Sequence, residues 1–229
     1  MTDDPNAIMV FAAGFGTRMG ALTKQLPKPL IRVGGVTLID RTLQLTKDIA
    51  PNRIVANTHY RADQMARHLR PKSVLLSHEQ QILETGGGLR AALPLLGNGP
   101  VYTMNPDVIW QGPNPLLLLR QSWRPDKMDA LLMCVPMGRT IGHSGGGDFA
   151  TDANGRISRG DDLVYGGVQI VKTDRLDDIH ETAFSLNVLW DMIADQNRLY
   201  YEEYPGYWCD VGSAKGIVLA EKLLATPDV

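Results

Sequence analysis

The residues with the clearest chemical potential form a glycine-rich turn behind a short apolar run. Residues 12–19 read Ala-Ala-Gly-Phe-Gly-Thr-Arg-Met, and Lys28 follows between two prolines. Gly14 and Gly16 allow the backbone to approach a ligand closely, and such a turn after a strand offers N–H donors to phosphate oxygens. Arg18 supplies a planar fork and Lys28 a point charge for the same anion. The pattern therefore predicts a site for a phosphorylated ligand.

Two other phosphate-binding motifs fit this turn poorly. A dinucleotide fingerprint reads G-x-G-x-x-G, but the third glycine here is Gly20, one position late, and no acidic residue ends the next predicted strand. A Walker loop needs Gly-Lys, a dipeptide that the sequence does not contain. These mismatches make a nicotinamide-dependent dehydrogenase or a P-loop enzyme a poor interpretation.

Two aspartates form a second candidate site. Asp107 and Asp210 each end or interrupt an apolar strand-like run, although they lie far apart in the sequence. Two carboxylates from distant segments can hold one Mg²⁺ while triphosphate oxygens fill its other positions. From the residues alone the alternative stays open that Asp107 caps a turn and Asp210 pairs with a lysine.

Alternating strands and helices must position these groups. The first part of the chain predicts strands over 8–13, 53–58, 73–77, 101–104 and 130–136, and helices over 37–49, 62–69, 87–96 and 116–123. This order is typical of βαβ units with a mostly parallel sheet, in which ligands bind beyond the carboxyl ends of the strands. The glycine turn, the loop after residue 58 and Asp107 all follow strands, so we expect them to face one crevice.

The second part of the chain is less regular. It predicts a hairpin of 149–150 with 156–158, a strand over 163–171, a helix over 186–193, a strand over 199–203 and a closing helix over 213–224. No linker is long enough to divide the chain. We expect one domain over 1–229, with a first half of about 1–135 and a second half of about 136–229.

Composition narrows the partners. Lys and Arg number 23 against 25 Asp and Glu, and neither sign is concentrated in a block, which argues against binding to nucleic acid or to an anionic membrane. No apolar run approaches the ~20 residues of a membrane span. The two cysteines, Cys134 and Cys209, form neither a zinc motif nor a disulfide framework, so a cytoplasmic location is expected.

The motifs together resemble a known enzyme family. Gly14-Phe-Gly-Thr-Arg-Met19 with Pro27-Lys-Pro-Leu30 is similar to the signature of the sugar-1-phosphate nucleotidyltransferases, which join an NTP to a sugar-1-phosphate and release pyrophosphate. Further matching segments are Leu83-Glu-Thr-Gly-Gly-Gly88, Asp107, Gly147-Asp-Phe149 and Trp208-Cys-Asp-Val-Gly212. The resemblance spans residues 8 to about 224 and is strongest to the N-acetylmuramic acid-1-phosphate uridylyltransferase branch, which serves cell-wall sugar recycling.

This resemblance implies a fold and a set of partners. The fold is a Rossmann-like three-layer αβα sandwich, with a mixed, mostly parallel sheet and a small C-terminal sugar-binding lobe. The substrates are an NTP, expected to be UTP, and a sugar-1-phosphate, with Mg²⁺ as cofactor and pyrophosphate as a product. We expect a monomer or a small homo-oligomer.

Residue roles follow from the motifs and the resemblance together. Arg18 and Lys28 are the expected catalytic residues, and Asp107 and Asp210 the expected metal ligands. The expected nucleotide-binding residues are Ala12, Ala13, Gly14, Gly16, Thr17, Arg18, Lys28, Asn57, Gln80, Thr85, Gly86, Gly87 and Asn105. The expected sugar-binding residues are Asp148, Gly167, Asn187 and Trp208.

One position departs from the family pattern and keeps an alternative open. The family usually has glycine before the first metal-binding aspartate, whereas this chain has Pro106, which restricts the loop and removes an N–H. A nucleotide-binding protein with weakened catalysis is therefore one alternative. Guanylyl or thymidylyl transfer to mannose-, heptose- or glucose-1-phosphate is the other, because spacing does not settle the base or the sugar.

Overall fold

The computed structural model describes residues 3–226, and its centre is a nine-stranded mixed sheet. The strand order is β11-β10-β12-β6-β1-β4-β5, and β8 pairs with both β12 and β13. The strands are β1 (Ala7–Val10), β4 (Arg53–Thr58), β5 (Leu75–His78), β6 (Val101–Met104), β8 (Ala130–Pro136), β10 (Phe149–Thr151), β11 (Ile157–Arg159), β12 (Leu163–Val171) and β13 (Leu199–Glu203). The strands β6, β1, β4 and β5 run parallel, and β12 joins this core antiparallel to β6.

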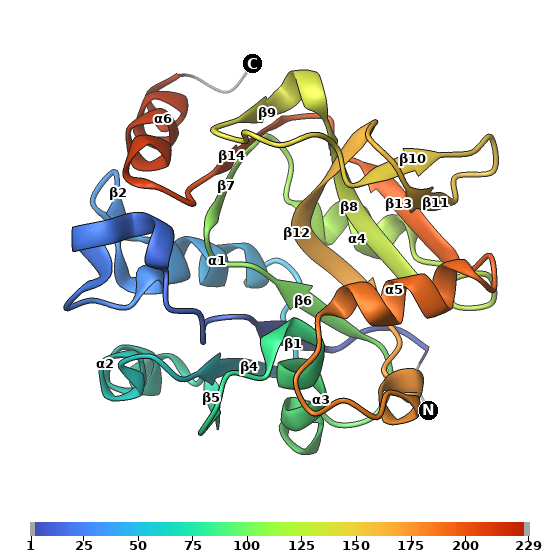
Figure 1. Ribbon diagram of the computed structural model, residues 1–229, viewed down its shortest axis with the longest axis horizontal. Helices are drawn as coiled ribbons and strands as arrows, with labels where there is room; N and C mark the ends of the chain where they lie inside the picture. The colour runs from blue at the N-terminus through green and yellow to red at the C-terminus, as the bar shows by residue number, and fades with distance from the viewer. Residues whose placement is uncertain (1–2, 227–229) are drawn as a thin grey trace.

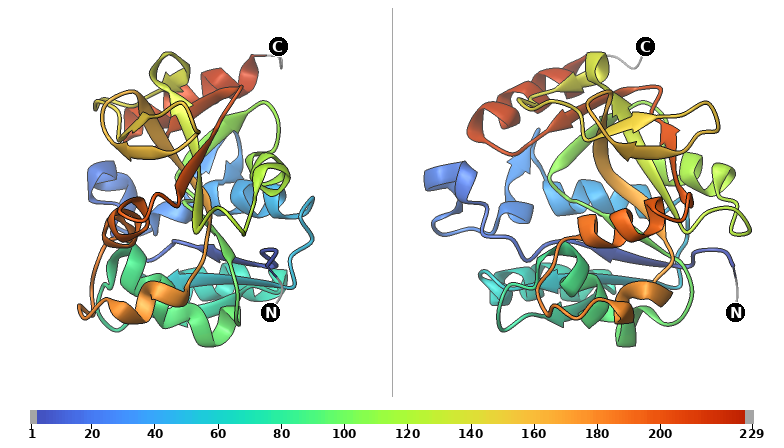
Figure 2. Two further views of the ribbon diagram at one scale, coloured as in Figure 1. Left: turned by 90° about the vertical axis from the view of Figure 1, so that its right-hand side faces the viewer. Right: turned by 45° about the vertical axis from the view of Figure 1, so that its right-hand side comes forward.

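Helices cover both faces of the sheet because both faces of its strands are apolar. In β1, Ala7 and Met9 belong to one buried cluster, while Ile8 and Val10 belong to another. Figure 1 shows α3 and α5 in front of the sheet and α1 and α4 behind it, and Figure 2 shows the same layers from the side. The helices are α1 (Leu38–Thr46), α2 (Ala62–Leu69), α3 (Glu84–Leu96), α4 (Pro115–Ser122), α5 (Leu186–Ala194) and α6 (Ala214–Ala225). The expected three-layer αβα architecture is confirmed.

A small second sheet carries the C-terminal part of the chain back to the first half. Its strand order is β7 (Val108–Gln111), β14 (Tyr207–Asp210) and β9 (Thr140–Ile141). With α6 it encloses a third apolar cluster that includes Met19, Ile109 and Val211. The pair of β14 with β7 is antiparallel and sets Asp210 opposite Val108, one residue after Asp107.

The residue pattern predicted most of these elements. The strands over 53–58, 101–104, 130–136, 163–171 and 199–203 and the helix over 62–69 are confirmed with the same bounds. The helices α1 and α6 have side-chain caps at their first turn, since Thr37 and Ser213 accept hydrogen bonds from Asp40 N and Gly216 N. The prediction missed β7, β9 and β14 and the 3-10 turns over Thr17–Thr23, because these short elements carry no sustained periodicity. No helix within residues 3–226 has the length and apolar character that crossing a membrane requires.

Candidate functional site

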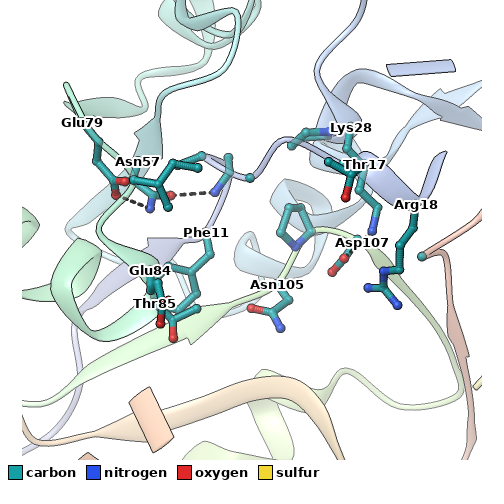
Figure 3. A pocket seen from close by; sticks show the side chains of 18 residues that line it. Phe11, Thr17, Arg18, Lys28, Asn57, Glu79, Glu84, Thr85, Asn105 and Asp107 are labelled. Carbon is teal, nitrogen blue, oxygen red and sulfur yellow. Dashed lines mark hydrogen bonds and ion pairs between the residues drawn. The ribbon is translucent and has the colours of Figure 1, made fainter. Parts of the chain in front are cut away.

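A cavity of about 330 Å³ lies beyond the carboxyl ends of β1, β4 and β6. It is lined by Phe11, Ala12, Ala13, Gly14, Gly16, Thr17, Arg18, Lys28, Pro29, Asn57, Glu79, Ile82, Glu84, Thr85, Asn105, Pro106, Asp107 and Gly212. Figure 3 shows Lys28, Asp107 and Arg18 at one end of the cavity and Asn57 and Glu79 at the other. The glycine turn, Asn57 near the end of β4 and Asp107 thus meet in one crevice. The loop after residue 58, which was expected to face the same crevice, contributes no lining residue.

The glycine turn folds back over the stem of Lys28. Gly16 has a φ of 65°, and a Cβ at this position would lie 2.9 Å from both Lys28 Cβ and Thr23 Cγ2. Both the positive φ and the close approach require glycine here. The Thr23 hydroxyl donates to Gly16 O at 3.0 Å and holds the turn closed.

Lys28 is held against a carboxylate inside the cavity. Its Nζ lies 2.5 Å from Asp107 Oδ2, and its side chain is only 11% exposed. Pro27 keeps the backbone extended before Lys28, with φ −64° and ψ 141°, and Pro29 follows in a short 3-10 turn. These prolines fix the direction in which the ammonium group points.

Arg18 lines this charged end of the cavity, and Asp210 lies beside it next to Gly212. A Cβ at Gly212 would lie 3.1 Å from Arg18 Nη1 and 2.9 Å from Asp210 Oδ2, so both side chains border the same bare glycine. Burial and then the charge of Asp107 raise the pKa of Asp210, against the smaller opposing effects of Lys28 and Arg18. The site therefore brings two carboxylates and two cations together.

The opposite end of the cavity contains a buried carboxylate that the sequence analysis missed. Glu79 is 3% exposed and follows β5 directly. Its Oε1 accepts from Asn57 Nδ2 at 2.7 Å, its Oε2 accepts from the Leu83 N–H at 3.1 Å, and Asn57 Oδ1 accepts from the Ala12 N–H at 2.6 Å. Asn57 thereby ties the end of β1 to Glu79. An acidic residue immediately after an apolar strand was the available signal for this group.

A second hollow of about 240 Å³ adjoins the cavity. Phe11, Thr85 and Asn105 line both spaces. The rest of its wall is formed by Asp148, Arg159, Tyr165, Ser185, Leu186, Asn187 and Trp190. Two of the expected sugar-binding residues, Asp148 and Asn187, therefore lie beside the cavity.

Six of the expected residues do not line either space, namely Gln80, Gly86, Gly87, Gly167, Trp208 and Asp210. Gln80 is exposed outside the cavity. The Gly86 and Gly87 N–H groups donate to Phe184 O at 2.8 and 3.1 Å, and a Cβ at Gly87 would lie 2.4 Å from Thr182 O. Because these glycines have no side chain, the segment before α5 packs directly against them. Their N–H groups are bonded to that segment and not directed at a ligand. Trp208 is 4% exposed within the core, and its Nε1–H donates to Gly166 O at 2.9 Å.

Gly167 holds a residue of the wall, Asn105, in place through a backbone hydrogen bond. It has a φ of 89°, and its carbonyl oxygen accepts from the Asn105 N–H at 2.8 Å. Asn105 itself lines both spaces. Wall residues that the sequence analysis did not single out include Phe11, Glu79, Ile82, Arg159 and Trp190.

The donor set at the charged end fits a hard divalent cation. Within residues 3–226, no group of three or more His, Cys, Asp or Glu side chains is arranged to hold a metal. Mg²⁺ is commonly held by one or two carboxylates together with substrate phosphates and water. Asp107 and Asp210 match that requirement, since burial and mutual repulsion leave the Asp210 carboxylate in need of positive charge.

Comparisons with known proteins agree with this geometry. Residues 8–172 match the model of the MobA-like NTP transferase domain. The chain is 36% identical to the N-acetylmuramate alpha-1-phosphate uridylyltransferase of Caulobacter vibrioides, covering 98% of this chain and 99% of the relative. It is 31% identical to the enzyme of the same name from Neisseria meningitidis, covering 94% and 96%.

A solved structure supports the fold. The crystal structure of HddC from Yersinia pseudotuberculosis complexed with GMP-PN superposes with a TM-score of 0.76 at 18% identity, covering 96% of this chain and 99% of HddC. The near full-length relatives confirm the resemblance that the Gly14–Met19 and Pro27–Leu30 motifs predicted. The chain belongs to the MobA-like NTP transferase family and is a nucleotidyltransferase.

Proposed function

We propose that the protein transfers a uridylyl group from UTP to N-acetylmuramic acid 1-phosphate and releases pyrophosphate. The names of the two relatives that match over almost their whole length support this choice of substrates. The observation that carries the reaction type is the grouping of Lys28, Asp107 and Arg18 at one end of a cavity, with Asp210 beside Gly212 of the same wall. This cavity shares part of its wall with a second hollow.

The triphosphate occupies the charged end of the cavity in this proposal. The turn from Ala13 to Thr17 supplies backbone N–H groups, whereas the Ala12 N–H is bonded to Asn57, and Arg18 and Lys28 supply full charges. The uridine lies toward Asn57, Thr85 and the residues around them. Gln80, Gly86 and Gly87 contribute through the segments they belong to, because they do not line the cavity.

Asp107 and Asp210 are the residues that would hold Mg²⁺. The ion would neutralise charge on the triphosphate and favour departure of pyrophosphate. Lys28 pairs with Asp107 at 2.5 Å. Its ammonium group would therefore lie close to the triphosphate bound at the metal that Asp107 would hold.

The reaction needs no general base. An oxygen of the sugar phosphate attacks the α-phosphorus of UTP, and the bond from that phosphorus to the β-phosphate oxygen breaks, giving a UDP-sugar and pyrophosphate. The nucleophile is already an anion at neutral pH. The main barrier is repulsion between two polyanions, since charges ~4 Å apart interact by about 4 kcal/mol at an effective dielectric of 20. Arg18 and Lys28 lower that repulsion and align the reactants.

The two halves of the chain divide the substrates. We assign the nucleotide to the half of about 1–135 and the sugar phosphate to the half of about 136–229. Asp148 and Asn187 line the second hollow and offer oxygen and amide groups to sugar hydroxyls. Gly167 supports this wall through Asn105, and Trp208 packs beneath it. A reaction that consumes UTP and salvages a cell-wall sugar belongs in the cytoplasm.

Guanylyl transfer is the second candidate, and Glu79 favours it. A carboxylate accepts hydrogen bonds only, and guanine presents two neighbouring N–H donors on its pairing edge, whereas uracil presents one. Glu79 is buried in the cavity wall. Each of its oxygens already accepts one hydrogen bond, from Asn57 Nδ2 and from the Leu83 N–H, and a carboxylate oxygen can accept a second.

A substrate panel tests both candidates. Five NTPs are paired with N-acetylmuramic acid 1-phosphate, N-acetylglucosamine 1-phosphate, mannose 1-phosphate and glucose 1-phosphate, and pyrophosphate release is followed. UTP with N-acetylmuramic acid 1-phosphate should be the fastest pair. Faster turnover with GTP would establish the second candidate, and nucleotide binding without pyrophosphate release would indicate a protein with weakened catalysis.

A further inference from the structure

The second hollow has a charged group that sugar hydroxyls do not require. Among the described residues that line this space, Arg159 is the one cationic side chain. It ends β11 and reaches across to α5, where its Nε and Nη2 donate to Asp191 Oδ1 at 2.9 and 2.8 Å. Neutral sugar rings are usually held by uncharged or acidic groups, so a guanidinium in this wall points to an anionic substituent.

Two aromatic rings, those of Phe149 and Trp190, lie against the guanidinium of Arg159. Its central carbon lies 5.3 Å from the centre of the Phe149 ring and 5.9 Å from that of Trp190. Both rings are buried, with exposures of 1% and 6%. Stacking of this kind fixes the plane of the fork while leaving its N–H edge available.

Arg159 retains hydrogen-bonding capacity toward the hollow. Its partner Asp191 is 60% exposed, and ion pairs between exposed groups are weak in water. Its Nη1 donates to Asn187 Oδ1 at 3.3 Å and its Nη2 also donates to Asn187 O at 3.2 Å, which leaves one Nη1 N–H without a partner among the described residues. A fork with five N–H donors can therefore serve a second carboxylate in addition to Asp191.

Three other polar groups of the wall are already bonded within the protein. Asp148 Oδ2 accepts from the Tyr165 N–H at 2.8 Å. The first N–H groups of α5, at Leu186 and Asn187, donate to Thr85 Oγ1 and Ser185 Oγ. The start of the helix therefore does not offer these N–H groups to an anion, and Arg159 is the positive charge in the described part of the wall.

We propose that Arg159 binds the carboxylate of an acidic sugar, namely the lactyl carboxylate that distinguishes N-acetylmuramic acid 1-phosphate from N-acetylglucosamine 1-phosphate. This inference rests on the proposed function. The phosphate end of the substrate meets Arg18 and Lys28 in the cavity, and the carboxylate end meets Arg159 in the adjoining hollow. Arg159 is then a specificity-determining residue.

The test compares two acceptors with UTP as donor. Arg159→Gln should lower kcat/KM for N-acetylmuramic acid 1-phosphate by about tenfold to a hundredfold, the range of a charge-assisted hydrogen bond. The value for N-acetylglucosamine 1-phosphate should change less than threefold. Arg156→Gln is the matched control, because Arg156 belongs to the same hairpin but faces a different surface hollow. Arg159→Lys should keep part of the preference.

A measurement on the unmodified protein guards against misfolding of the variant. The methyl ester of the lactyl carboxylate should bind about as weakly as N-acetylglucosamine 1-phosphate. An equal loss for both acceptors in Arg159→Gln would overturn the proposal, since a merely structural role predicts that result. Tight binding of the ester would overturn it as well. If the unmodified protein transfers uridylyl only to N-acetylglucosamine 1-phosphate, the proposed function itself fails.

Discussion

Lys28 Nζ lies 2.5 Å from Asp107 Oδ2, although 79 positions separate the two residues in the chain. The lysine comes from the segment after the glycine turn, and the aspartate from the loop after β6. Because β1 and β6 are parallel neighbours, these two loops leave the same edge of the sheet. The order of the strands therefore explains why a lysine and an aspartate so far apart in the sequence form an ion pair in the cavity.

Loss of either cation should slow turnover strongly. Arg18→Ala and Lys28→Ala should each lower the rate of pyrophosphate release by about a hundredfold, which corresponds to ~2.7 kcal/mol of transition-state stabilisation. The cause is uncompensated repulsion between the two phosphorylated substrates. Lys24→Ala is the control, because Lys24 is exposed nearby and does not line the cavity. Near-normal rates in both cavity variants would contradict the assigned phosphate site.

Removal of one carboxylate should change the response to magnesium. Asp107→Asn and Asp210→Asn should each raise the Mg²⁺ concentration for half-maximal activity by about tenfold or more, because a neutral amide is a weaker ligand for a hard cation. A Mg²⁺ titration of initial rates measures this shift. Asp63→Asn, an exposed change in the first turn of α2, should leave the titration where it was. An unchanged titration in both site variants would remove Asp107 and Asp210 as ligands.

A methyl group at Gly87 should destabilise the fold. Its Cβ would lie 2.4 Å from Thr182 O, and a backbone oxygen cannot move aside as a flexible side chain can. Gly87→Ala should therefore lower the free energy of unfolding by about 1–3 kcal/mol. Gly138→Ala is the matched control, since no atom lies within 4 Å of the corresponding Cβ. Urea denaturation compares the two, and equal stability would show that the segment before α5 is not tightly packed on α3.

Asp129 should make stability depend on pH. Burial acts to raise its pKa, but hydrogen bonds from Arg198 and Lys172, together with their charges, outweigh burial and lower the pKa below its usual value. The folded state therefore binds this proton less readily than the unfolded state. The resulting stabilisation is fully present above the unfolded carboxyl pKa, about 4, and is lost as the pH falls through the lowered folded pKa.

Replacement of this carboxylate should remove that dependence. Asp129→Asn should lower the free energy of unfolding by about 2 kcal/mol at pH 7 and by much less in strong acid. Asp178→Asn is the control, because Asp178 is 60% exposed and pairs with Arg175 three positions earlier. Urea denaturation at several pH values measures both variants. A loss that is independent of pH would contradict the assigned role.

The sequence by itself determined the elements and the chemistry of the phosphate site. Largely apolar runs predicted the bounds of β6 and β8, because a strand buried on both faces is apolar along most of its length. The roles of Gly16 and Lys28 were predicted from residue type. A close backbone approach requires glycine, and a fixed positive charge requires a cationic side chain. The alternation of strands and helices then implied that these groups meet at one edge of the sheet.

Only the tertiary structure decided which polar groups face the cavity and which hold the fold together. Glu79 and Arg159 are ordinary charged residues in the sequence, and they become wall residues through the pairing of β4 with β5 and the packing of β11 beside α5. Gly86 and Gly87 resemble ligand-binding glycines, yet the segment before α5 takes their N–H groups. Local patterns report what a residue can do, whereas its partners come from segments about twenty to a hundred positions away.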